Sequence, residues 1–130
     1  MMNADDLNQL ARQAVDSAVA VHSALGPGLL ESTYQACLAH ELRTRGLALN
    51  TQVGLPVVYD GVKLEIGYRI DVLIAESLIL EIKAIDVIAP IHRAQLLSYL
   101  RLSGCRLGLL LNFNVPLMKD GIVRIVNGLR

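Results

Sequence analysis

Hydrophobic positions along the chain first recur at helical spacing and then change period near residue 48. Apolar residues return every three or four positions over residues 5–25 and again over residues 29–45. The Gly-Pro-Gly segment at 26–28 separates these stretches, because proline disfavours helical backbone before it and glycine tolerates a turn. The sequence therefore predicts two helices in the first 45 residues, with Gly46 ending the second.

The rest of the chain favours strands, interrupted by one helix. Residues 49–59 have the pattern of extended structure, and Asp60-Gly61 between apolar runs predicts a hairpin. Nearly continuous Ile, Leu and Val content predicts strands that are buried on both faces. These expected elements are strands at 70–74, 78–85 and 106–113, a helix from Pro90 to about residue 103 closed by Gly104, and a short last strand at 122–126. The whole reads as one α/β domain over residues 1–130, with a mixed sheet flanked by helices.

Composition narrows the class of protein. Hydrophobic residues make up 53% of the chain, aromatic residues only 4%, and tryptophan is absent, so the core must be aliphatic. No apolar run reaches about 18 residues, which predicts that no segment spans a membrane. The acidic start, with Asp5 and Asp6, is unlike a signal peptide, and the two cysteines are too few for a metal cluster. Free thiols fit a reducing compartment, so we expect a cytoplasmic protein.

Charge gives no general affinity for nucleic acid. The chain has twelve basic and twelve acidic residues, for a net charge of zero. Residues 1–75 contain five Lys/Arg and eight Asp/Glu, a net of −3, whereas residues 76–130 contain seven and four, a net of +3. Any surface that faces phosphate groups is therefore expected to draw on the second half.

Three charged residues interrupt the apolar strands. Asp71 lies within the run at 70–74, and Glu81 and Lys83 lie within the run at 78–85. Strand side chains alternate, so Glu81 and Lys83 share one face. Buried charges are normally paired or bound to a metal. One interpretation is a structural ion pair between Lys83 and either carboxylate.

The other interpretation is a metal site. Mg²⁺ prefers oxygen ligands and is typically held by one or two carboxylates together with water and phosphate oxygens. Asp71 and Glu81 would supply carboxylates from neighbouring strands, and the Ile82 backbone carbonyl would be a further ligand. Lys83 would orient an attacking water or stabilise charge on a phosphate.

Four segments together resemble a known group of proteins. Asp71 followed by Glu81-Ile82-Lys83 resembles the D…(D/E)XK signature of the PD-(D/E)XK nuclease superfamily. Residues 28–34, GLLESTY, match the GxxExxY pattern that names one branch of it. Residues 92–99, HRAQLLSY, resemble that family's H-x-A-Q-L-L-x-Y-L helix, including the QxxxY pair of RecB-like nucleases. Residues 109–121 resemble its closing LLINF…VPLLKDG stretch, so the similarity covers about residues 14–126.

The resemblance implies an αβββαβ core with a mixed sheet and a metal site at the edge of that sheet. It assigns Asp71 and Glu81 as ligands of Mg²⁺ or Mn²⁺, with the Ile82 carbonyl beside them and Lys83 as the catalytic lysine. Glu31 becomes the helix carboxylate that approaches the site, and it is a further candidate metal ligand. Ile70 stands where the signature has proline, which ligation does not require.

The resemblance also implies that Gln95 and Tyr99 border the site. They are four residues apart, so they project from one face of the predicted helix, with His92 on the same face. The residues alone leave Tyr34 and His92 open, because tyrosines often lie in a core with a bonded hydroxyl and histidines often cap helices.

Two functions follow as hypotheses. The first is a Mg²⁺- or Mn²⁺-dependent nuclease that hydrolyses phosphodiester bonds in DNA or RNA. The second is a non-catalytic module that binds nucleic acid or protein and retains the nuclease fold. A homodimer or a protein partner is compatible with either, and the sequence does not decide the strandedness or the polarity of cleavage.

Overall fold

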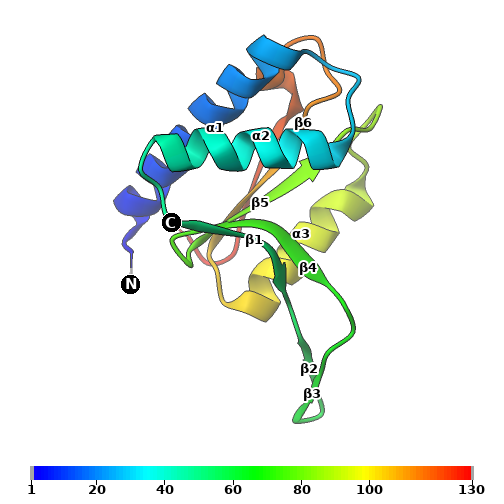
Figure 1. The fold of residues 1–130 in the computed structure, drawn as a ribbon. Coiled ribbons are helices and arrows are strands. Elements are labelled where there is room, and N and C mark those ends of the chain that lie inside the picture. The colour runs from blue at the N-terminus through cyan, green and yellow to red at the C-terminus, as the bar shows by residue number, and fades with distance from the viewer. Residues whose placement is uncertain (1, 130) are drawn as a thin grey trace.

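The fold begins with two consecutive helices. The structure is a computed structural model that describes residues 2–129. Helix α1 (Ala4–Leu25) starts at a capping box in which the Asn3 side chain accepts a hydrogen bond from the Asp6 amide at 2.8 Å. It ends at Gly26, whose φ of 69° stops the helix at the Gly-Pro-Gly segment. Helix α2 (Glu31–Thr44) follows and lies beside α1 (Figure 1).

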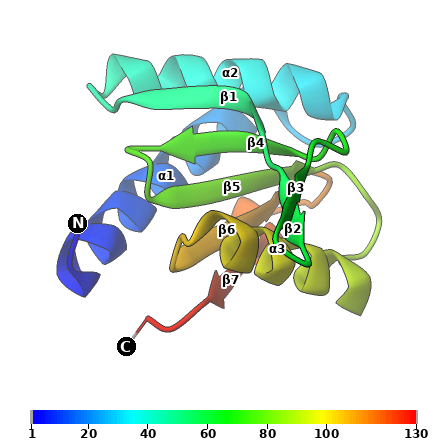
Figure 2. The ribbon, with the colours of Figure 1, turned by 90° about the horizontal axis from the view of Figure 1, so that it is seen from below.

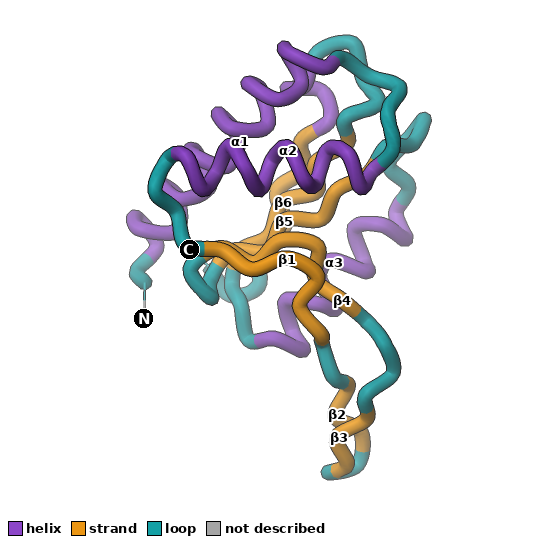
Figure 3. The backbone as a smooth tube through the Cα atoms, viewed as in Figure 1, coloured by secondary structure: helices purple, strands orange, loops and turns teal. Residues whose placement is uncertain are grey.

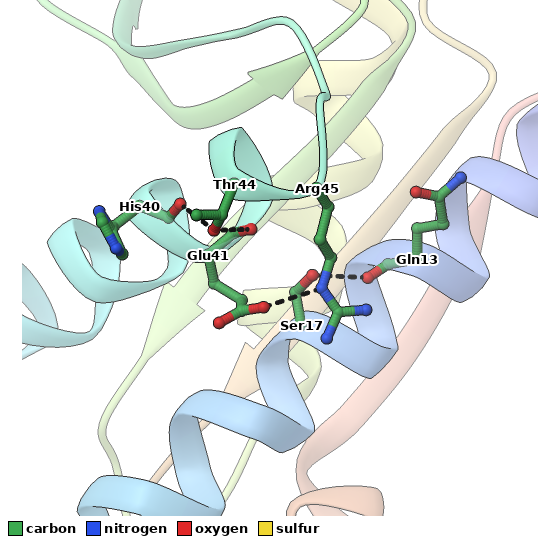
Figure 4. A network of polar contacts seen from close by, with 6 residues as sticks. All are labelled: Gln13, Ser17, His40, Glu41, Thr44 and Arg45. Atoms are coloured by element: carbon green, nitrogen blue, oxygen red, sulfur yellow. Dashed lines mark hydrogen bonds and ion pairs between the residues drawn. The ribbon is translucent and has the colours of Figure 1, made fainter.

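Side chains near its last turn fix the end of α2. The Thr44 hydroxyl lies 2.9 Å and 2.8 Å from the His40 and Glu41 carbonyl oxygens, and Arg45 donates to Glu41 at 2.9 Å (Figure 4). These contacts add side-chain hydrogen bonds and one ion pair to the last turn of the helix. The predicted helices at 5–25 and 29–45 are therefore confirmed within two residues at each end.

A five-stranded mixed sheet has the order β1-β4-β5-β6-β7 (Figure 2). The pairs β1–β4, β4–β5 and β6–β7 are antiparallel, whereas β5 and β6 are parallel and are joined through a helix. The strands are β1 (Leu49–Gly54), β4 (Arg69–Ile74), β5 (Leu78–Lys83), β6 (Leu107–Asn112) and β7 (Ile122–Val126).

Helices cover both faces of this sheet (Figure 3). On one side α1 and α2 pack over a core that includes Leu80 and Ile82 of β5. On the other side α3 (Pro90–Ser103) contacts β6 and β7 over a second core that includes Ile79. The burial of β5 on both faces explains its nearly continuous apolar run. The order of helices and strands confirms the expected mixed α/β fold with an αβββαβ core.

A small hairpin projects from the body of the domain (Figures 1 and 2). Strands β2 (Val57–Tyr59) and β3 (Val62–Leu64) form a separate two-stranded sheet. Asp60 and Gly61 both have positive φ, 52° and 74°, as a tight hairpin turn between them requires. The predicted hairpin is confirmed, but the extended segment at 49–59 is broken between Gly54 and Val57.

The connection from β6 to β7 contains a short 3₁₀ turn, η1 (Met118–Gly121), that the sequence pattern did not predict. Its last residue, Gly121, lies so close to the end of β6 that no side chain fits there. Within the described residues, no helix is long and apolar enough to cross a membrane.

Replacing Gly121 with alanine should lower the free energy of unfolding by about 1–3 kcal/mol, because a Cβ would stand 2.0 Å from the Asn112 backbone oxygen. Urea denaturation measures this. The control is Gly54→Ala, where the nearest atom, on the Arg69 side chain, is 3.8 Å away and a change within about 0.5 kcal/mol is expected. Equal losses in the two variants would contradict the close approach.

Candidate active site

The hydrogen-bond ladder between β4 and β5 stops at the two central carboxylates. Val72 pairs with Leu80, and the same register would next place Asp71 opposite Glu81. Instead, the Asp71 amide donates to Glu81 Oε2 at 2.8 Å, and the Ile82 amide donates to Asp71 Oδ2 at 2.8 Å. Each carboxylate thus accepts a hydrogen bond from the backbone of the other strand. This exchange holds both carboxylates at the point where the two strands diverge.

Glu81 is in an unfavourable place for a charge. It is 5% exposed, and burial, followed by the negative charge of Asp71, raises its pKa to about 8. The positive charge of Lys83 acts in the opposite direction but does not offset these effects. In the absence of a cation, Glu81 therefore retains a proton at neutral pH.

Lys83 is half-buried at the end of β5, on the same side of the strand as Glu81. Over residues 2–129 the ion pairs are Arg45–Glu41 and Lys63–Glu65. The structure therefore has no ion pair of Lys83 with either carboxylate, which removes the structural interpretation of this lysine. Its ammonium group remains available to a ligand.

Glu31 reaches the site from the opposite layer. It is the first residue of α2, and its Oε1 accepts a hydrogen bond from the Ala84 amide at 3.3 Å. Ala84 directly follows Lys83, so the carboxylate lies across the end of β5. The structure thus brings Glu31 to the end of the strand that holds Glu81.

Gln95 and Tyr99 approach from α3. The Gln95 amide donates to the Tyr99 hydroxyl at 3.1 Å, so the two form a pair on one face of that helix. Burial, followed by the negative charge of Glu81, raises the pKa of Tyr99. The structure thus joins to each other the two α3 residues that the sequence assigned to the border of the site.

Tyr34 and His92, which the sequence left open, have structural roles. Tyr34 is fully buried and stacks on Phe113 with ring centroids 4.5 Å apart, while its hydroxyl donates to the Gly26 carbonyl. It therefore anchors the loop between α1 and α2. His92 accepts a hydrogen bond from the Ala89 amide at 2.8 Å through Nδ1, which caps α3.

Comparison with known proteins gives the family. A family model described as the PD-(D/E)XK nuclease superfamily matches residues 8–125. The chain belongs to the PD-(D/E)XK nuclease superfamily. No curated protein matches it, and no solved structure matches it either. Nucleases of this superfamily generally use divalent metal ions.

The residues at the site fit the divalent ions that the superfamily nucleases use. Nowhere in residues 2–129 do three His, Cys, Asp or Glu side chains gather as a closed metal cage. Asp71 and Glu81 instead offer two carboxylates side by side, which suits an ion that keeps water and phosphate oxygens as further ligands. The buried Glu81 supports the same conclusion, because a nearby cation would replace its proton.

Sequence reasoning missed two glutamines of this superfamily domain. Gln52 lies in β1, level with Asp71, and its φ of 51° is left-handed within the strand. Its amide nitrogen is 3.3 Å from Asp71 Oδ1 and 2.7 Å from Gln35 Oε1. Gln52 therefore connects the Asp71 carboxylate to α2. Nothing in the residue type or its spacing indicated this contact, which depends on the backbone geometry.

Asn112 is the third missed residue, and the sequence contained a signal for it. It is a buried polar residue that ends the apolar run of β6, opposite Lys83 in the ladder. Its side chain bonds both the amide and the carbonyl of Ile85, at 3.1 and 2.9 Å. Asn112 thereby fixes the chain just after Lys83.

Glu81→Gln should stabilise the metal-free domain at high pH. The folded-state pKa is raised from 4.5 to about 8, so the stability that the protonated Glu81 contributes is lost as the pH rises through that range. The glutamine keeps an acceptor for the Asp71 amide and carries no charge. Urea denaturation in the presence of a chelator measures the free energy of unfolding at pH 5 and at pH 9. From pH 5 to pH 9, the variant should gain several kcal/mol of stability relative to the unaltered chain, on the order of 1.4 kcal/mol for each unit of pKa shift. Parallel pH profiles for the two proteins would contradict the raised pKa.

Proposed function

We propose that this domain is a Mg²⁺- or Mn²⁺-dependent nuclease that hydrolyses phosphodiester bonds in DNA or RNA. The observation that carries the proposal is the pair of carboxylates, Asp71 and Glu81, held together at the divergence of β4 and β5, near a lysine that forms an ion pair with neither of them. Two oxygen ligands and a free cation are what phosphodiester hydrolysis assisted by a metal needs.

Each of these three residues takes a distinct role in the proposal. Asp71 and Glu81, with the Ile82 carbonyl, hold the ion. The ion, when bound, supplies Lewis-acid polarisation of the phosphate and of the attacking water. Lys83 orients that water and stabilises the negative charge that builds up on the phosphate oxygens.

The neighbouring side chains position these groups. Glu31 approaches the end of β5 and is a further candidate ligand, while Gln95 and Tyr99 border the site from α3. We also assign the domain to the GxxExxY branch of the superfamily. In support, Gly28 has a φ of 100° that favours glycine, Glu31 faces the site and Tyr34 anchors the loop between them.

One observation favours a second candidate, a non-catalytic module that binds nucleic acid or protein. The hairpin exposes several large apolar side chains, among them Val58, Tyr59 and Val62. Contiguous exposed apolar surface commonly marks a binding region. In this alternative, the hairpin binds a protein partner or a second copy, and the carboxylates serve the structure alone.

Mn²⁺ and Mg²⁺ should bind the purified domain, and Asp71→Ala and Glu81→Ala should each abolish binding. Because the ion replaces the proton on Glu81, the apparent affinity should rise by up to about tenfold for each pH unit between pH 6 and pH 8. Isothermal titration in two buffers with different ionisation enthalpies measures both the affinity and the released proton.

The matched control for this titration is Asp16→Ala, which removes an exposed carboxylate on α1 outside the site. It should bind as the unaltered chain does. The same binding in the Asp71 and Glu81 variants would exclude the proposed ligands, and no binding at millimolar metal with no cleavage would favour the non-catalytic module.

Lys83→Ala should lower the rate of nucleic-acid cleavage by about 100-fold or more while metal binding persists, because the lysine acts on the developing charge and not on the ion. Cleavage of labelled DNA and RNA, single-stranded and duplex, measures the rate. Lys119→Ala removes an exposed lysine from η1 and serves as the control. Full activity in the Lys83 variant would reject the assigned role.

A further inference from the structure

A cavity of about 460 Å³ lies between the base of the hairpin and α3. Tyr68, which lines it, directly precedes β4, the strand that holds Asp71, and Gln95 and Tyr99 of α3 line it as well. The residues that define its chemistry are Tyr68, Ile91, His92, Gln95, Ser98 and Tyr99.

The lining combines flat apolar walls with polar edges. Tyr68 is 45% exposed, and its ring lies 6.0 Å from that of Tyr99 at an angle of 59°, so the two rings form a tilted aromatic pair in the lining. Gln95 donates one N–H to Tyr99 and keeps its carbonyl and second N–H free. His92 accepts the capping hydrogen bond through Nδ1, so its Nε2 can bond a ligand. Ser98 is exposed.

This combination matches a nucleobase, which has apolar faces and a hydrogen-bonding edge. Stacking on an aromatic side chain contributes about 1–3 kcal/mol per base and tolerates any sequence. In a duplex these faces are covered, and affinity then comes mainly from many phosphate contacts. A chain with a net charge of zero is poorly suited to that second mode of binding.

Two arginines near the cavity suit the phosphate backbone of one nucleic-acid strand. Arg69 follows Tyr68 at the start of β4, and Arg93 follows His92 in α3. Both residues are exposed, and each is the chain neighbour of a residue that lines the cavity. Two arginines can contact the phosphates of one strand, which complements the aromatic wall.

We propose that this cavity holds an unpaired nucleobase of a single-stranded nucleic acid, next to a phosphate at Asp71 and Glu81. The proposal rests on the proposed nuclease function and adds to it the class of substrate. The domain accordingly selects single strands, or unpaired stretches, over a continuous duplex.

The test compares two tyrosines of the hairpin region. Tyr68 lines the cavity, whereas Tyr59 is 74% exposed near the hairpin turn and does not. Fluorescence anisotropy with a labelled twelve-nucleotide oligothymidylate, in a chelator to prevent cleavage, should show binding weakened about tenfold or more by Tyr68→Ala. Tyr59→Ala should leave binding unchanged, and Tyr68→Phe, which keeps the ring, should retain it.

A second pair of variants avoids any effect on folding. Ile91 and Val87 are 70% and 75% exposed, and only Ile91 lines the cavity. Ile91→Glu should weaken oligothymidylate binding through its charge and bulk, and Val87→Glu should not. Equal effects within either pair, or tighter binding of the matching duplex than of the single strand, would overturn the proposal.

The results separate this proposal from the nuclease function. Cleavage that depends on Lys83 but is unaffected by Tyr68→Ala would leave the nuclease and remove the base-binding cavity. Single-strand binding that depends on Tyr68, in a domain that neither binds metal nor cleaves, would keep the cavity and remove the nuclease. Competition by thymidine monophosphate at similar concentrations would show that a free nucleotide, not a strand, is the ligand, and would also overturn the proposal.

Discussion

The site depends on two hydrogen bonds between carboxylates and backbone, from the Asp71 amide to Glu81 and from the Ile82 amide to Asp71. Two strands that diverge inside a sheet leave amide groups without carbonyl partners, and an unpaired buried amide is costly. Here the carboxylates take the place of the missing carbonyls: one bonds the amide of Asp71 and the other that of Ile82. The strands can therefore separate at this point without leaving either amide unpaired, and the separation brings two charged groups together.

In that arrangement the two carboxylates repel each other when both are ionised. Glu81 is buried beside another carboxylate, and its proton removes the repulsion at neutral pH. A cation would do the same while leaving both groups ionised. The two carboxylates thus satisfy the backbone of the diverging strands and at the same time create a place that favours a cation.

The helix on the other side of the sheet is tied to the same point. Gln35 of α2 meets Gln52, which in turn meets Asp71, and Glu31 bonds the chain after Lys83. Tyr34, between these two positions of α2, is buried against the loop and prevents the helix from shifting. The glycine, glutamate and tyrosine of the GLLESTY segment thus act together: one allows the turn, one reaches the site and one holds the helix in place.

The sequence by itself determined the order and nearly all the boundaries of the helices and strands, because each is specified by local spacing of apolar residues and by glycine and proline at the ends. It also singled out Asp71, Glu81 and Lys83, since charges within apolar strands are visible without a fold. Only the tertiary structure decided that Lys83 makes no ion pair with Asp71 or Glu81, that Gln52 contacts Asp71 and that Tyr68 lies near Tyr99. These contacts join residues that are distant in sequence, and their geometry depends on strand divergence, a left-handed residue and the placement of the hairpin, none of which a local pattern encodes.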